Sequence, residues 1–262
     1  MTQLTDIVHV NIPFSMLSQS FLDRFIRDRL NPEIGFDSQV LDTCPPSRME
    51  EIAQHIREAG LAVTFHAPFI DLAPGSPDPK IRALTRQRFQ QVIRLIPLFQ
   101  PRSVVCHTGY DQRRYWPLRE LWLQNSLETW VPIAEAIQSG GAVLMLENVY
   151  DQSPDEMIEL FENLKDYGVG FCLDTGHQSA FSTASLNEWI TSLEPYLGQL
   201  HLHDNFGDRD DHLALGTGRI DFPHLFERLG AMPRPQPIVT LEPHREEDLW
   251  PSLVYLEKQW PW

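Results

Sequence analysis

The chain has 262 residues, of which 42% are hydrophobic and 22% charged. This composition is ordinary for a soluble globular protein, and the length suffices to bury a sizeable core. Thirty-six acidic residues against 21 basic ones give a formal net charge of −15, which disfavours nucleic acid as a partner without excluding it.

The three cysteines, Cys44, Cys106 and Cys172, form no CxxC pair, and the last two lie inside apolar segments. We therefore expect no disulfide framework, which fits a reducing cytoplasm. The start of the chain lacks the basic and apolar regions of a signal peptide, and no apolar run has membrane-spanning length. The expected location is cytoplasmic, without a membrane partner; nothing in the pattern indicates an oligomeric state.

Strand-like and helix-like segments alternate along the chain. Short β-rich apolar runs predict strands at residues 6–13, 31–36, 62–68, 102–108, 142–149, 169–175, 198–204 and 237–243. Apolar residues at helical spacing predict helices between them, at 48–59, 80–98, 120–138, 155–166, 186–197 and 246–258. Eight such units of about 30 residues predict a (β/α)8 TIM barrel spanning 1–262 as one α/β domain. The competitor, a doubly wound open sheet, would place a glycine-rich turn after the first strand, and NIPFSMLSQS contains no glycine.

Residues that can bind a divalent metal lie where these strands end or in the segments that follow. They are His66, His107, Glu147, Asp174, His177, His201, Asp210, His212 and Glu242. The carboxyl ends of parallel strands meet at one mouth of a barrel, where such enzymes build their active sites. The pattern therefore predicts a metalloenzyme.

Glu147 and Glu242 each follow an apolar strand, where an isolated charge would be expensive. The structural interpretation is a salt bridge; the functional one is a shared cation or an acid/base pair, and two glutamates at one mouth favour the second. In LDTGH, Asp174 and His177 are separated by a short turn that lets both face one point. Aspartate and histidine are compatible ligands, although a helix cap and a core imidazole would explain them separately.

In HLHD, strand geometry sends His201 and His203 to the same face, and we expect His201 to reach the metal. His203 is a second ligand, a substrate contact or a structural histidine. His66 and His107 are divided between metal ligation and substrate binding.

Asp210 and His212 lie in the long segment 205–220, and such connections are often functional. Arg113 and Trp116, after the fourth strand, are candidates to line a substrate pocket.

The ordered motifs FHAPF, CHTG, LEN, LDTGH, HLHD, DDHLALGTGRIDF and LEP resemble the xylose isomerase-like TIM-barrel superfamily from strand three to strand eight. That group includes sugar isomerases and epimerases, and endonuclease IV. The isomerase branch implies one divalent ion, Zn or Mn, held by Glu147, Asp174, His201 and Glu242, with His177 facing the substrate. The endonuclease IV branch implies up to three zinc ions, with His66, His107, His177, Asp210 and His212 as additional ligands.

From this resemblance we expect an isomerase or epimerase of a small sugar, polyol or sugar phosphate. Glu147 and Glu242 would be its acid/base pair, transferring a proton through an enediolate. The alternative is a multi-zinc phosphodiesterase or AP endonuclease, and a third hypothesis is a barrel that binds a metal or sugar without catalysis. A small carbohydrate is the expected partner, and nucleic acid is disfavoured by the charge.

Overall fold

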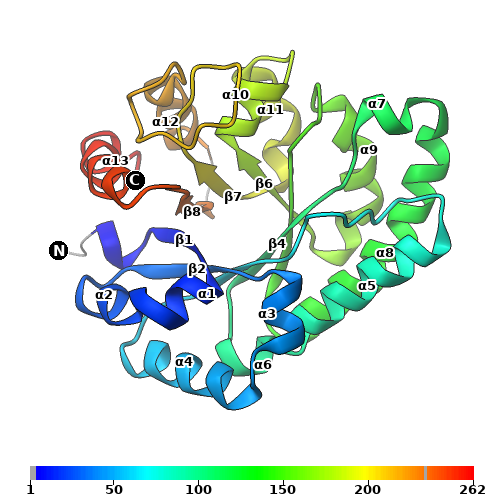
Figure 1. Ribbon diagram of the computed structural model, residues 1–262. Coiled ribbons are helices and arrows are strands. Elements are labelled where there is room, and N and C mark those ends of the chain that lie inside the picture. The colour runs from blue at the N-terminus through cyan, green and yellow to red at the C-terminus, as the bar shows by residue number, and fades with distance from the viewer. Residues whose placement is uncertain (1–3, 233–234) are drawn as a thin grey trace.

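The computed structural model describes residues 4–232 and 235–262. Eight parallel strands form a closed barrel in chain order, and helices surround it (Figure 1). The strands are β1 His9–Pro13, β2 Asn31–Gly35, β3 Thr64–His66, β4 Ser103–His107, β5 Val143–Glu147, β6 Gly170–Asp174, β7 Leu197–Leu202 and β8 Ile238–Leu241. The blue and red ends of the chain meet where β1 pairs with β8. The predicted TIM barrel is confirmed.

Helices follow the strands on the outside of the barrel. They are α1 Phe14–Met16, α2 Leu22–Arg27, α3 Ser38–Thr43, α4 Pro46–Glu58, α5 Pro79–Ile93, α6 Ile96–Phe99, α7 Gln112–Tyr115, α8 Arg119–Ser139, α9 Asp155–Leu164, α10 Thr175–Phe181, α11 Leu186–Leu193, α12 Phe222–Gly230 and α13 Glu246–Gln259. A π-helical turn, Leu17–Phe21, joins α1 to α2, and short 3-10 turns cover Leu4–Asp6, Trp116–Leu118, Lys165–Tyr167 and Glu194–Tyr196.

The helix predicted at 80–98 is wrong as one element, because α5 ends at Ile93 and α6 begins at Ile96. Pro97 has no backbone N–H to donate to the Ile93 carbonyl, so an uninterrupted α-helix would lose a hydrogen bond there. Ile81 and Leu84, at apolar positions of the predicted helix, are exposed. The helical segments between Phe14 and Thr43, and helices α7, α10 and α12, are additions to the predicted set.

The apolar core lies between the barrel and its helices, where Trp122, Trp130 and Trp189 are fully buried. The interior of the barrel combines a small buried apolar cluster, Val105, Met145 and Cys172, with polar side chains. Ser103 donates to Gln199 across the interior, and Gln199 in turn donates to Glu33. The barrel interior therefore carries a buried polar network.

Within the described residues, no helix combines the length and apolarity needed to cross a lipid bilayer.

Candidate metal centre

Strand register places the predicted ligands next to one another. His107 on β4 pairs in register with Glu147 on β5, and Asp174 on β6 pairs with His201 on β7. His66 ends β3, and Glu242 follows β8 directly. These residues therefore form one cluster at the carboxyl ends of the strands.

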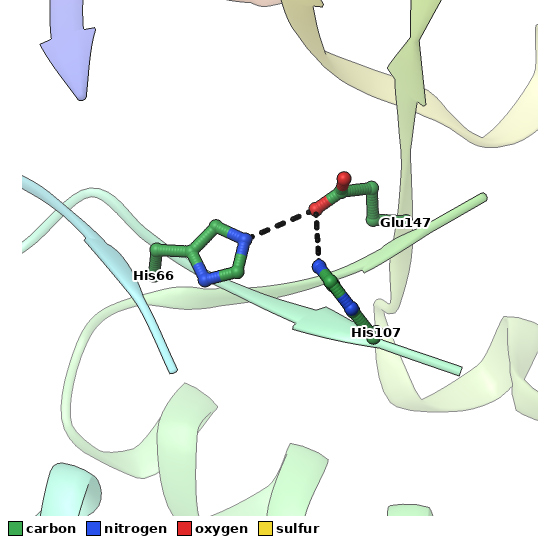
Figure 2. A group of neighbouring side chains, drawn as sticks. All are labelled: His66, His107 and Glu147. Atoms are coloured by element: carbon green, nitrogen blue, oxygen red, sulfur yellow. Dashed lines mark hydrogen bonds and ion pairs between the residues drawn. The ribbon is translucent and has the colours of Figure 1, made fainter. Parts of the chain in front are cut away.

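A first group joins His66, His107 and Glu147, whose ligand atoms all lie within 4.8 Å of one another. Figure 2 shows both imidazoles pointing at one oxygen of the glutamate. The Nε2 atoms of His66 and His107 lie 3.2 and 3.5 Å from Glu147 Oε2. All three side chains come from consecutive strands, so the barrel itself fixes this geometry.

A second group contains Glu147, Asp174 and His201, and also meets the 4.8 Å criterion. His201 Nδ1 lies 3.1 Å from Glu242 Oε1, 3.5 Å from Glu147 Oε2 and 4.0 Å from Asp174 Oδ2. Glu147 thus belongs to two groups, and the four residues predicted for a single ion meet around one imidazole nitrogen.

A third group is formed by His203, Asp210 and His212. His212 Nε2 lies 3.1 Å from Asp210 Oδ2, and His203 Nε2 lies 3.6 Å from Asp210 Oδ1. His203 Nε2 is also 3.2 Å from both oxygens of Asp174, which connects this group to the second. Of the three interpretations left open for His203, this position favours a ligand.

The loop that carries Asp210 and His212 is organised by Asp204. Its carboxylate accepts hydrogen bonds from the backbone N–H groups of Asn205, Gly216, Gly218 and Ile220. The backbone of Asp204 also pairs with that of Leu213 in an antiparallel bridge. His212 has a φ of 50°, in the left-handed region that non-glycine residues seldom adopt. Such strain is typical of functional sites, where the surroundings hold the residue in place.

His177 lies between the groups. Its Nδ1 is 3.1 Å from Glu147 Oε1, and its Nε2 is 3.3 Å from Asp210 Oδ2. Asp174 caps the helix that carries it, accepting from the His177 backbone N–H. A Cβ atom at Gly176 would lie 1.8 Å from the ring of His203, so only glycine fits in LDTGH at this point.

Three of the histidines share one hydrogen-bonding arrangement. His66, His177 and His212 each donate from Nδ1 to a backbone carbonyl, those of Ala67, Asn148 and Glu242. Their Nε2 atoms, left with a lone pair, face carboxylate oxygens. A lone pair and a carboxylate at such distances repel unless a cation, or a second proton on the ring, lies between them. The donor set, nitrogen and oxygen from histidine and carboxylate, suits Zn or Mn, so the residues fit the predicted metal.

Glu33, which is fully buried on β2, was not among the residues predicted for the centre. His201 Nε2 donates to Glu33 Oε1 at 3.0 Å, so in the neutral imidazole Nδ1 keeps its lone pair toward the three carboxylates. Nδ1 is buried and has no hydrogen-bond partner of its own. Glu33 therefore fixes which nitrogen of His201 faces the centre, as carboxylates behind metal-bound histidines do. Its position inside a strand was the available signal.

Without a bound ion, protons on some of the histidines provide part of the positive charge that an ion would supply. Burial would lower the pKa of His212, but the hydrogen bond to Asp210 and the charge of Glu242 raise it to about 9. Burial opposed by Asp174, Asp210 and Glu147 likewise leaves the pKa of His177 well above its ordinary value. At His107, by contrast, burial prevails and lowers the pKa to about 3.

Arg113 and Trp116 lie outside the cluster. Arg113 forms two hydrogen bonds with Asp111 and lies 5.4 Å from the ring centre of Tyr150, close to the mouth. Trp116 is 70% exposed on a 3-10 turn. Both belong to short helical elements where a loop was expected.

Comparison with known proteins yields relatives by sequence. An uncharacterized protein of Methanocaldococcus jannaschii is 29% identical over 64% of this chain and 59% of its own length. The alignment thus spans less than two thirds of that relative. A protein of Mycobacterium ulcerans named "Probable endonuclease 4" is 28% identical over 77% of this chain and 82% of its own length.

Solved structures share the fold. The protein TTHB071 of Thermus thermophilus, from crystals soaked with ZnCl2, has a TM-score of 0.75 at 24% identity over 97% of each chain. A D-tagatose 3-epimerase-like protein has a TM-score of 0.79 at 21% identity, over 96% of this chain and 97% of its own.

The family model described as "Xylose isomerase-like TIM barrel" matches residues 33–259. This match covers most of the chain, and the closed parallel barrel agrees with it. The chain belongs to the xylose isomerase-like TIM-barrel family.

Proposed function

We propose that the protein is a hydrolase of small phosphoesters that uses more than one divalent ion. The observation that carries this proposal is that the possible ligands around Glu147 and Asp174 form five overlapping triads, three of which are the groups described above. A single-ion isomerase needs only the second group. The first and third would leave several buried imidazoles and a carboxylate facing one another without purpose. This departs from the isomerase expected from the sequence.

The position of each residue indicates which ion it would hold. His66, His107 and Glu147 would hold one ion, Glu147, Asp174, His201 and Glu242 a second, and His203 or His177 with Asp210 and His212 a third. Bound ions would lower the pKa of a coordinated water molecule and neutralise charge on the phosphoryl oxygens. Glu33 and the backbone carbonyls orient the imidazoles beforehand. The relation to a protein named "Probable endonuclease 4" supports phosphoester chemistry.

The charge favours a small substrate over a polynucleotide. A net charge of −15 repels a phosphate backbone, which proteins bind through several free lysines and arginines. At the mouth, Arg113 pairs with Asp111, and Arg245 pairs with Asp248. These ion pairs neutralise two of the cations that a polyanion would use.

The test is hydrolysis of bis(4-nitrophenyl) phosphate by protein loaded with Zn²⁺ or Mn²⁺, together with elemental analysis. We expect two or three ions per chain and measurable turnover. Asp210→Asn should abolish turnover, whereas Glu51→Gln, an exposed carboxylate on α4, should leave it unchanged. Full activity of Asp210→Asn, or a single bound ion, would contradict the proposal.

A second candidate function is the isomerisation or epimerisation predicted from the sequence. Glu242 and Glu147 both contact His201 Nδ1, at 3.1 and 3.5 Å, and provide two carboxylates at one ion position. This reaction would exchange a C–H proton of a ketose with D2O, which NMR detects. It would depend on Glu147 and Glu242 and would survive Asp210→Asn, so the same variant separates the two reactions.

A further inference from the structure

A row of five rings crosses one side of the candidate metal centre. Phe69 stacks on His107 with ring centres 4.4 Å apart, and His107 meets His177 edge-on at 6.1 Å. Phe181 stacks on His177 at 5.9 Å, and Tyr150 contacts Phe181 at 5.1 Å. We call Phe69, His107, His177, Phe181 and Tyr150 the aromatic row. Its members follow four successive strands, β3 to β6, so they share the mouth of the barrel.

The middle of the row belongs to the candidate centre, because the ring nitrogens of His107 and His177 lie 3.5 and 3.1 Å from Glu147. Its two ends are open: Phe69 is 47% and Tyr150 45% exposed. A phosphoryl group held near Glu147 would therefore have a half-exposed ring at each end of the row. Half-exposed rings at the edge of a polar site are typical of surfaces that bind an apolar part of a ligand.

The charge around the row selects among such ligands. Arg113 lies over the Tyr150 ring, and its guanidinium group donates two hydrogen bonds to the Asp111 carboxylate, at 2.9 Å each. Arg113 therefore lies over one face of the Tyr150 ring with its charge already paired, and the ring remains half-exposed. Such an apolar surface suits an uncharged ring better than a second phosphate or a hydroxyl-rich sugar.

We propose that the substrate is a phosphoester carrying a flat, uncharged aromatic or heteroaromatic group, and that this group lies against the aromatic row. The inference rests on the proposed function for the position of the phosphate. It goes beyond that function by naming the organic part that the site selects.

The test uses phosphonates, whose C–P bond prevents hydrolysis, so that binding is measured independently of turnover. Phenylphosphonate, cyclohexylphosphonate and methylphosphonate are titrated into the Zn²⁺-loaded protein by calorimetry. Stacking on an exposed ring predicts that phenylphosphonate binds about tenfold more tightly than methylphosphonate. Cyclohexylphosphonate, which is apolar but not flat, should fall between them.

Phe69→Leu and Tyr150→Leu keep an apolar side chain and remove the ring. At least one of them should reduce the preference for phenylphosphonate about threefold or more, with methylphosphonate binding unchanged. The control, Trp250→Leu, removes a 40% exposed ring from α13 and should change neither.

The inference fails if phenylphosphonate binds no better than either comparison ligand, or if neither variant reduces its preference. Failure of the proposed function would look different. In that case bis(4-nitrophenyl) phosphate would not be hydrolysed even though phenylphosphonate were still preferred. Hydrolysis without any preference among the phosphonates would overturn only the inference.

Discussion

Replacing Glu33 by glutamine tests whether this buried carboxylate positions His201. Both oxygens of Glu33 accept hydrogen bonds. Oε1 accepts from His201 Nε2 and Asn11, at 3.0 and 3.1 Å. Oε2 accepts from Thr64, Gln199 and Thr240, at 3.0, 2.6 and 3.1 Å. A glutamine keeps the shape but turns one acceptor atom into a donor, so one of these two sets must lose its partner.

Each orientation of the new amide has a different cost. If its NH2 faces His201, the imidazole must move its proton to Nδ1, which then points into the ligand cluster and blocks a metal. If its NH2 faces the other set, Gln199 loses its shortest acceptor and keeps only Thr240 Oγ1, at 3.2 Å, and the hydroxyls of Thr64 and Thr240 lose theirs. An unsatisfied buried donor costs about 1–3 kcal/mol, and more when a charge is lost.

The pKa of Glu33 gives a second estimate of the stability that the glutamine variant would lose. Burial would raise this pKa, but the charge and hydrogen bond of His201 bring it down to about 2, from an ordinary value of 4.5. By linkage that difference corresponds to roughly 3 kcal/mol of stability. Because the folded-state pKa is depressed, this stability is present above pH 4.5 and is lost as the pH falls toward 2. The two estimates agree.

We therefore expect Glu33→Gln to lower the free energy of unfolding by about 3 kcal/mol in urea titrations of the metal-free protein. Its affinity for Zn²⁺, measured by calorimetry against a competing chelator, should fall about 10- to 100-fold. Glu51→Gln is the control for both measurements. Wild-type metal affinity in Glu33→Gln would refute the assignment of Glu33 as the residue that orients His201.

Asp210, His212 and Gly176 can each be tested separately. Asp210→Asn should reduce the metal content by about one ion per chain, since Asp210 belongs only to the third ligand group; unchanged content by elemental analysis would remove that group. Zn²⁺ affinity should rise from about pH 6 to 9, with proton release seen by calorimetry in buffers of different ionisation enthalpy, because the pKa of His212 is raised to about 9. The stability that His212 gives the metal-free protein has the opposite sign, being present below pH 6.5 and lost as the pH approaches 9; a pH-independent affinity would contradict both. Gly176→Ala should destabilise the fold by about 1–3 kcal/mol, because its methyl group would collide with the His203 ring. Helix propensity alone predicts a gain of about 0.5–1 kcal/mol, so the sign of the change in urea unfolding decides.

The barrel, and the gathering of the candidate ligands at one mouth, could be predicted because each signal was local. His107 and Glu147 each close a short apolar run, and the barrel rule places all such ends at one mouth. The pairing of neighbouring strands then places these residues side by side. The helices that were not predicted lie where a local pattern was absent, as in the segment 14–43.

Glu33 shows why other parts of the centre escaped prediction. It occupies NPEIG, where a carboxylate between Pro32 and Ile34 in a short strand has no neighbour in the sequence to explain it. Its partners, at 22 to 207 positions along the chain, become adjacent only when the barrel closes. The role of His203 was likewise undecided, because its contact with Asp174 depends on the space that Gly176 leaves.

The number of buried carboxylates links stability to the metal. Glu33, Glu147, Asp174 and Glu242 are all buried in one small volume, with Asp210 at its edge. Such a density of negative charge requires positive charge nearby. Protonated histidines supply it at low pH, and bound ions would supply it when the histidines are neutral. Above about pH 9 the metal-free protein therefore lacks the stability that protonated His212 provides, and no other positive charge has replaced it. An ion bound there would stabilise the fold by binding only the native state, so under the proposed function the same residues would couple the stability of the barrel to the metal.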